Sequence, residues 1–146
     1  MKNKMLLILL LIFALPSLCI CKGFQVAESL LKQGEADMKE QHYESAIKNF
    51  NKVINLNPKA AAAYYDRGLI EYKSEYYVGA IKDFSKTIEL DYNVAESYYY
   101  RGLSKGKSGD HQNGIEDLNK SGDLGYSQAI DAVRKVIENY REKQLK

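Results

Sequence analysis

The sequence predicts an all-α protein built from repeated helical hairpins. Written in rows of 34 residues, the chain aligns glycines, isoleucines and aromatic residues with no insertion or deletion. Within each row, apolar residues recur at spacings of three and four, which is the period of an amphipathic helix. A further amphipathic stretch follows the last row. Together these observations predict an α-solenoid of three helical hairpins followed by a C-terminal capping helix.

The N-terminal segment, residues 1–21, is predicted to be a signal peptide. Lys2 and Lys4 precede an unbroken apolar run over residues 5–15, and Pro16 follows it. The apolar stretch is short for a bilayer span, which takes about 20 residues. We therefore expect an exported protein, whether secreted, periplasmic or luminal, with no membrane span in the mature chain. An uncleaved membrane anchor is less favoured.

Both cysteines of the chain, Cys19 and Cys21, lie at the end of this segment. A lipidated cysteine would need a small residue directly before it, and these two follow Leu18 and Ile20. A lipid anchor is therefore less favoured than ordinary cleavage near one of the cysteines. Residues 22–26 would then form a short lead to the first repeat.

Charge and composition exclude several functions. Lys2 and Lys4 account for the whole formal net charge of +2, so the remaining chain is formally neutral. This neutrality removes the usual electrostatic reason to expect nucleic acid or an anionic membrane surface as a partner. The twelve tyrosines are the compositional outlier, and they supply flat, amphipathic surface for packing or binding.

Three complete repeats are predicted, at residues 27–60, 61–94 and 95–128. In each repeat, fixed positions hold glycine, an aromatic residue, a small residue or a large apolar residue. We predict a structural role for ten residues at these positions: Gly34, Tyr43, Ala46, Phe50, Gly68, Tyr77, Ala80, Phe84, Gly102 and Leu118.

The second repeat illustrates the predicted hairpin. Its first helix is expected over about residues 61–74 and its second over about residues 78–90. Gly68 and Ala80 are small, which indicates that two helix backbones approach closely there. Phe84 is large and is expected to fill the wedge between neighbouring hairpins.

The third repeat is rich in glycine, with Gly102, Gly106, Gly109 and Gly114. An interior glycine costs a helix about 1 kcal/mol relative to alanine. We therefore expect the third repeat to be the loosest of the three.

Polar residues sixteen positions apart form a second pattern. Charge occurs at both positions or at neither: the pairs are Gln33 with Asn49, Arg67 with Asp83, and Arg101 with Asp117. We expect each pair to meet across its hairpin, as an amide pair in the first repeat and as partly buried ion pairs in the other two.

Residues 129–146 are predicted to form the capping helix and a tail. Polar residues occupy most of one face, and the other carries an apolar stripe made of Ile130, Val133, Val136, Ile137 and Tyr140. Such a helix would cover the apolar face that the last hairpin leaves open.

Gly34, Tyr43, Ala46, Phe50 and Pro58 have the order and spacing of a tetratricopeptide repeat, and the chain resembles this family over about residues 27–128. The resemblance implies a right-handed solenoid whose concave surface, lined by the first helix of each hairpin, binds proteins or peptides without a cofactor. The chain departs from the family pattern at three residues: Tyr92 and Tyr126, which replace the proline, and Gly114, which replaces the alanine.

By register, eleven residues are expected to line this concave groove and to bind the partner: Leu31, Glu35, Met38, Tyr65, Asp66, Leu69, Tyr72, Glu96, Tyr99, Tyr100 and Leu103. Tyrosine is enriched at binding hot spots, and the carboxylates favour a partner with Lys or Arg. The alternative for each tyrosine is that it only packs between hairpins. Relatives that clamp a peptide carboxylate use Lys, Asn and Arg in the groove, and the matching positions here hold Leu31, Glu35, Asp66, Glu96 and Tyr100.

Catalytic and metal sites are not expected. The segment 102–106 has the G-x-S-x-G pattern of a hydrolase nucleophile, but it falls inside a predicted helix and no strand precedes it. His42 and His111 lie in different repeats and have no nearby ligand partner. The sequence thus predicts a non-catalytic adaptor or scaffold. The alternative is a structural or self-assembling component of an envelope or secretory complex, with homo-oligomers formed by like copies.

Overall fold

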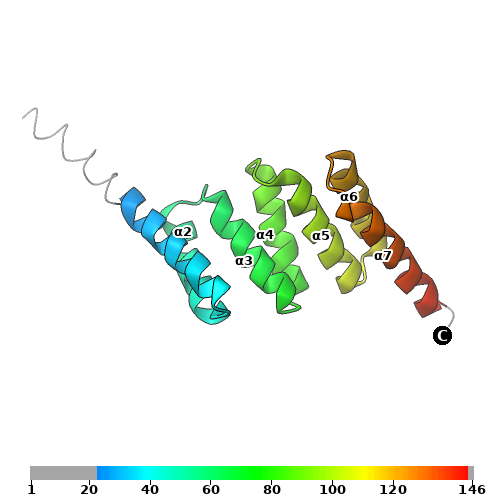
Figure 1. Cartoon of the computed structure of the whole chain (residues 1–146), viewed down its shortest axis with the longest axis horizontal. Helices are drawn as coiled ribbons and strands as arrows, with labels where there is room; N and C mark the ends of the chain where they lie inside the picture. The colour runs from blue at the N-terminus through cyan, green and yellow to red at the C-terminus, as the bar shows by residue number, and fades with distance from the viewer. Residues whose placement is uncertain (1–22, 145–146) are drawn as a thin grey trace, which may run out of the picture.

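A computed structural model describes residues 23–144, which contain seven helices and no strand. The first helix spans residues 23–39. The others are α2 (Tyr43–Leu56), α3 (Ala61–Lys73), α4 (Tyr77–Glu89), α5 (Val94–Ser108), α6 (His111–Asp123) and α7 (Gln128–Gln144) (Figure 1). The predicted all-α solenoid of three hairpins and a terminal helix is confirmed. The predicted signal peptide lies outside the described residues.

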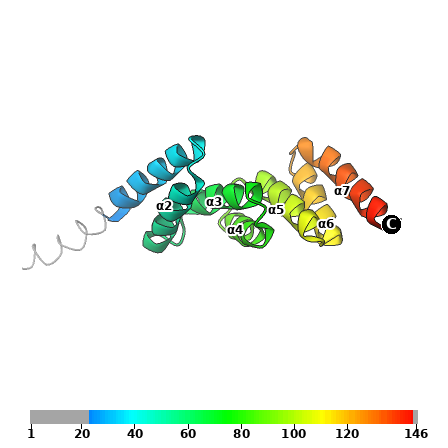
Figure 2. The same ribbon diagram turned by 90° about the horizontal axis from the view of Figure 1, so that it is seen from below.

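The helices form two layers along the solenoid. Figure 2 shows the helix over residues 23–39, α3, α5 and α7 in one layer, and α2, α4 and α6 in the other. The layer of first helices lies on the inner side of the curve. All four of its helices begin at the upper edge of Figure 1 and end at the lower edge. The groove therefore has one edge at helix N-termini and one at helix C-termini.

The turn inside each hairpin repeats with the sequence. Gln41, Glu75 and Gly109 occupy the same register position, and all three have positive φ, at 62°, 61° and 100°. A left-handed residue ends a helix sharply and lets the chain reverse. The second helix of each hairpin therefore packs back on the first.

Glycine and a large side chain pack together inside each hairpin. Phe50, Phe84 and Leu118 are fully buried on the three second helices. A methyl group added at Gly34 would lie 2.6 Å from the Phe50 ring, and one at Gly102 would lie 2.9 Å from the Leu118 side chain. Only glycine leaves space for these side chains, which explains why glycine recurs in the register.

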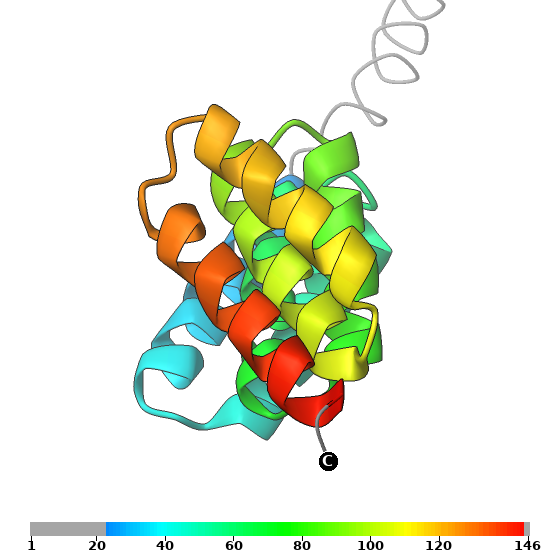
Figure 3. The ribbon, with the colours of Figure 1, turned by 90° about the vertical axis from the view of Figure 1, so that its right-hand side faces the viewer.

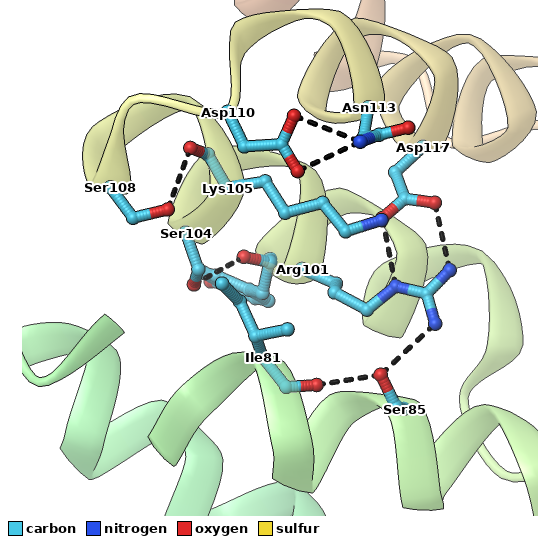
Figure 4. A network of polar contacts seen from close by, with 10 residues as sticks. Ile81, Ser85, Arg101, Ser104, Lys105, Ser108, Asp110, Asn113 and Asp117 are labelled. Carbon is cyan, nitrogen blue, oxygen red and sulfur yellow. Dashed lines mark hydrogen bonds and ion pairs between the residues drawn. The ribbon is translucent and has the colours of Figure 1, made fainter. Parts of the chain in front are cut away.

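An arginine in the second and third hairpins links each hairpin to its neighbour. Arg67 donates two hydrogen bonds of 2.7 Å to Asp83, sixteen residues ahead, and another to Asn51, sixteen residues behind. Arg101 repeats this arrangement with Asp117 ahead, at 2.8 Å, and Ser85 behind, at 3.1 Å (Figure 4). The expected ion pairs are thus present, and the same side chains also join adjacent hairpins.

In the first hairpin the predicted amide pair is wrong. Gln33 and Asn49 do not bond to each other; both donate to Asp37, at 2.9 and 3.0 Å. Ser45 also donates to Asp37, at 2.6 Å. These hydrogen bonds, those from Ser45 and Gln33 first, lower the pKa of the Asp37 carboxyl. Asp37, one helical turn after Gln33, therefore bridges the side-chain amides of Gln33 and Asn49.

The last helix, α7, lies at the end of the solenoid beside α6 and in front of α5 (Figure 3). It buries Ala129, Ala132 and Val136, the last two of which pack against Leu118 of α6. The predicted apolar stripe is wrong at Ile130, which is 66% exposed, and Tyr140 is also exposed, at 44%. Small alanines let α7 approach closely, and this turns Ile130 toward solvent.

Candidate functional site

A pocket of about 750 Å³ opens on the inner layer between α5 and α7. Tyr72 of α3, Tyr99 and Leu103 of α5 line it, and all three are half-buried. Tyr99 and Leu103 are one helical turn apart, so they present one continuous face. We call this space the inner pocket. Three of the eleven predicted groove residues are thus brought together around one cavity of ligand size.

Tyr65 is a correction to the predicted groove. Its side chain is only 7% exposed, and its ring packs edge-on against Phe84 at 6.0 Å and against Tyr92 at 5.9 Å. Burial strongly raises the pKa of its hydroxyl. Tyr65 therefore belongs to the core between hairpins rather than to the open groove.

Tyr100 also packs mainly between hairpins. Its ring stacks on Phe84 at 5.6 Å with an interplanar angle of 18°, and it meets Tyr72 at 5.5 Å. The rings of Tyr99 and Tyr100 contact each other, with centroids 5.2 Å apart. The tyrosines of the inner layer thus form a continuous aromatic cluster, in which Tyr100 supports the residues that line the inner pocket.

The remaining apolar groove residues are half-buried. Leu31 and Met38 pack against the core cluster that contains Phe50, and Leu69 packs against the one that contains Phe84. Each therefore contributes to the solenoid core as well as to the inner surface.

Three carboxylates of the first helices act on the same groups electrostatically, and we call Glu35, Asp66 and Glu96 the acidic cluster. Within residues 23–144, none of the three forms an ion pair within 4.0 Å. Burial and the charge of Glu35 raise the pKa of Asp66 to about 6. Burial and the charges of all three carboxylates raise the pKa of the Tyr92 hydroxyl.

Sequence reasoning missed the role of Tyr92 and Tyr126. Tyr126 contacts Tyr99 with ring centroids 4.9 Å apart, and its hydroxyl donates to Glu96 at 3.4 Å. Burial, followed by the charge of Glu96, raises the pKa of Tyr126 to about 12. The signal was available, since these are the positions where tyrosine replaces the proline of the repeat.

Sequence reasoning also missed the polar wall of the inner pocket. Lys107, His111, Asp131, Lys135 and Glu142 all line it, and the last three come from α7. The His111 ring lies 5.0 Å from Tyr140, and its Nδ1 atom is buried with no hydrogen-bond partner in the described chain. The wall therefore carries charges of both signs.

The described residues contain no metal-binding cluster, since no group of three His, Cys, Asp or Glu side chains converges between residues 23 and 144. The segment 102–106 lies inside α5, with Ser104 fully buried and donating to the Tyr100 carbonyl at 2.7 Å. The strand-to-helix turn of a nucleophilic serine is therefore missing there. Over the same described range, no helix has both the length and the apolar character that crossing a membrane requires.

A protein-family model described as a TPR repeat matches residues 34–75. This match contains the Gly34 to Gly68 period, the end of the first helix, α2 and α3. No match was found among curated proteins. Residues 34–75 thus match a tetratricopeptide repeat, and the fold of the described chain is that of tetratricopeptide domains.

Solved structures of similar fold include tetratricopeptide domains. The second such domain of human RPAP3, in complex with the HSP70 peptide SGPTIEEVD, is 25% identical, with a TM-score of 0.73 and coverage of 78% of this chain and 97% of that one. The Arabidopsis OM64 domain is 18% identical, with a TM-score of 0.74 and coverage of 80% and 98%. The first domain of Spaghetti (RPAP3), bound to an HSP90 peptide, is 18% identical, with a TM-score of 0.74 and coverage of 80% and 94%.

Proposed function

We propose that this protein is a non-catalytic module, exported from the cytosol, that binds a segment of a partner protein in its concave groove and acts as an adaptor or scaffold. The observation that carries the proposal is the inner pocket, whose floor is made of Tyr72, Tyr99 and Leu103. Aromatic and aliphatic side chains in a concave site supply most of the affinity in peptide recognition, and the charged wall supplies orientation.

The charge of the groove indicates the kind of partner. The peptide bound by the RPAP3 domain, SGPTIEEVD, is acidic. Here the acidic cluster would repel such a segment, and its carboxylates have no ion-pair partner among the described residues. Basic side chains of a partner would relieve the repulsion that raises the pKa of Asp66. A segment with Lys or Arg therefore fits the acidic cluster.

The test of binding is partner capture with a groove variant. Replacing Tyr72, Tyr99 and Leu103 together with alanine should abolish capture of partners from an extract of the source cells, measured by quantitative mass spectrometry. Raising the salt concentration should weaken capture by the unaltered protein, because the attraction to the acidic cluster is screened. Full capture by a well-folded triple variant would refute the groove as the binding site.

A matched control removes three apolar side chains elsewhere. Leu56, Val78 and Leu124 are large, exposed and located at the ends of second helices. Their joint replacement with alanine should leave capture unchanged. Circular dichroism and thermal melting of both variants separate loss of binding from loss of folding, and light scattering separates a monomeric binder from a self-assembling one.

Export is tested independently of binding. Lys2, Lys4 and the apolar run over residues 5–15 support cleavage near Cys21. Mass spectrometry of protein recovered from the source cells should find a chain that starts near residue 22 and lies outside the cytosol. Recovery of a cytosolic chain that retains Met1 would count against export and leave the binding proposal standing.

A further inference from the structure

The groove has a basic edge opposite Asp66 and Glu96 of the acidic cluster, whereas Glu35 lies one turn before Lys39 on the helix over residues 23–39. Lys39, Lys73 and Lys107 occupy one register position, 34 residues apart, and each is the last or next-to-last residue of a first helix. All three are exposed, and within residues 23–144 none forms an ion pair. We call them the lysine edge. Since first helices all end at the lower edge of Figure 1, the lysine edge runs along one side of the inner layer.

Lys107 shows that the lysine edge faces the groove at α5. Lys107 lines the inner pocket together with Tyr99 and Leu103 of the same helix. Lysine near a helix C-terminus also interacts favourably with the helix dipole, and this alone would account for a small stabilisation. The neighbouring Lys105 shows the contrast, because it turns inward and pairs with Asp117 at 2.7 Å. Lys107 instead keeps its charge free on the inner side, and Lys39 and Lys73 are exposed at the same register position.

The opposite side of the groove is acidic. Glu96 lies in the first turn of α5, and Asp66 lies in the first half of α3. Glu96 and Lys107 are eleven residues apart on α5, which corresponds to about 16 Å along the helix axis. The backbone of a bound segment lying midway would be about 8 Å from Glu96 and from Lys107. One side chain of the segment and one groove side chain together span this distance.

We propose that the segment bound in this groove is extended and alternates basic with acidic side chains. The inference rests on the proposed function and assigns the ligand class of the same site. In an extended chain, successive side chains point to opposite sides. A segment laid along the solenoid thus directs every second side chain toward Asp66 and Glu96 and the others toward the lysine edge. Alternation satisfies both sides, whereas a purely basic or acidic segment leaves one side repelled.

The test uses two labelled nonapeptides of identical composition. In one, lysine and glutamate alternate strictly on either side of a central leucine. In the other, four lysines, the leucine and four glutamates follow in blocks. Fluorescence anisotropy at low salt should give the alternating peptide an affinity about tenfold higher, the equivalent of two further ion pairs of modest strength. Equal affinities, or no binding of the alternating peptide, would overturn the inference.

Two lysine variants assign the effect to the groove. Replacing Lys39, Lys73 and Lys107 with glutamine should remove the preference for the alternating peptide. The control replaces three exposed lysines of the second helices, Lys48, Lys52 and Lys120. It changes the net charge equally and should preserve the preference for the alternating peptide. Equal loss in both variants would show a general charge effect and overturn the inference. Neither variant alters Tyr72, Tyr99 or Leu103, so a failed peptide preference and a failed groove remain distinguishable.

Discussion

At the scale of single residues, Phe84 carries the contact between the second and third hairpins. It is fully buried, packs against Tyr65 within its hairpin and stacks on Tyr100 of the next one. Phe84→Ala removes these contacts and leaves a cavity, so the free energy of unfolding should fall by about 3–5 kcal/mol. Urea denaturation followed by circular dichroism measures the change. An unaltered midpoint would show that Phe84 does not fill the space between hairpins.

Asp66 makes stability depend on pH. Its pKa is raised from the ordinary value of 3.8 to about 6, because burial and Glu35 favour the neutral form in the folded state. Protonation of Asp66 therefore stabilises the folded state. This contribution is fully present below about pH 4 and is lost as pH rises through about 6. Asp66→Asn should stabilise the protein at pH 7.5 by about 1–2 kcal/mol, less than the full shift implies because the side chain is partly exposed.

The control for Asp66→Asn is the same pair of proteins at low pH. At pH 4 the carboxyl is already largely neutral in the folded state, so variant and unaltered protein should unfold at nearly the same urea concentration. If the difference between the two proteins were the same at pH 4 and pH 7.5, ionisation of Asp66 would not be its cause.

At the scale of helices, α5 and α6 approach each other more closely than side chains would permit. A methyl group at Gly114 would lie 2.8 Å from the Gly102 carbonyl oxygen and 3.0 Å from the Gly106 nitrogen. Backbone atoms cannot rotate away, so Gly114→Ala should destabilise the protein by about 1–3 kcal/mol. This outcome runs against helix propensity, which favours alanine by about 1 kcal/mol.

Gly122 in the same helix is the matched control. A methyl group there would meet only the Ala129 side chain, at an ordinary 3.9 Å. Gly122→Ala should therefore leave thermal stability unchanged or increase it. If both substitutions had the same effect on the melting temperature, close approach of α5 and α6 would not explain the glycine at position 114.

Repetition explains which contacts could be predicted from the sequence. The pairs of Arg67 with Asp83 and of Arg101 with Asp117 were predictable because two repeats show the same spacing. The bridge through Asp37 was not, since the equivalent positions hold Glu71 and Lys105 and only Asp37 accepts from both amides of its hairpin. The burial of Tyr65 was not predictable either, because a small rotation of a first helix decides between its core and groove sides.

At the scale of the whole molecule, α7 closes the solenoid through one face. Val136 is buried beside Leu118, whereas Ile130 on the same helix is exposed. Val136→Asp places a charge in this apolar contact and should destabilise the protein by about 2–4 kcal/mol. Ile130→Asp should change stability by no more than about 0.5 kcal/mol. Equal thermal midpoints for the two variants would contradict the observed orientation of α7.

The orientation of α7 also limited prediction of the site. Position by position, α7 follows the register of a first helix, and Asp131 and Arg134 correspond to Ser97 and Tyr100 of α5. In α5 these residues face the preceding hairpin, and in α7 both are exposed. Its polar residues therefore reach the inner pocket, which the repeat alone could not indicate.

The polar links of Arg67 and Arg101 allow the chain to grow by whole units. Each arginine reaches sixteen residues back and sixteen residues ahead, so each hairpin offers the same partners on both sides. After tandem duplication of residues 61–94, the copied arginine would meet Ser85 of the original hairpin and the aspartate of its own. A gene encoding such a chain can therefore lengthen its groove in steps of one hairpin, because the joint between units is already self-compatible.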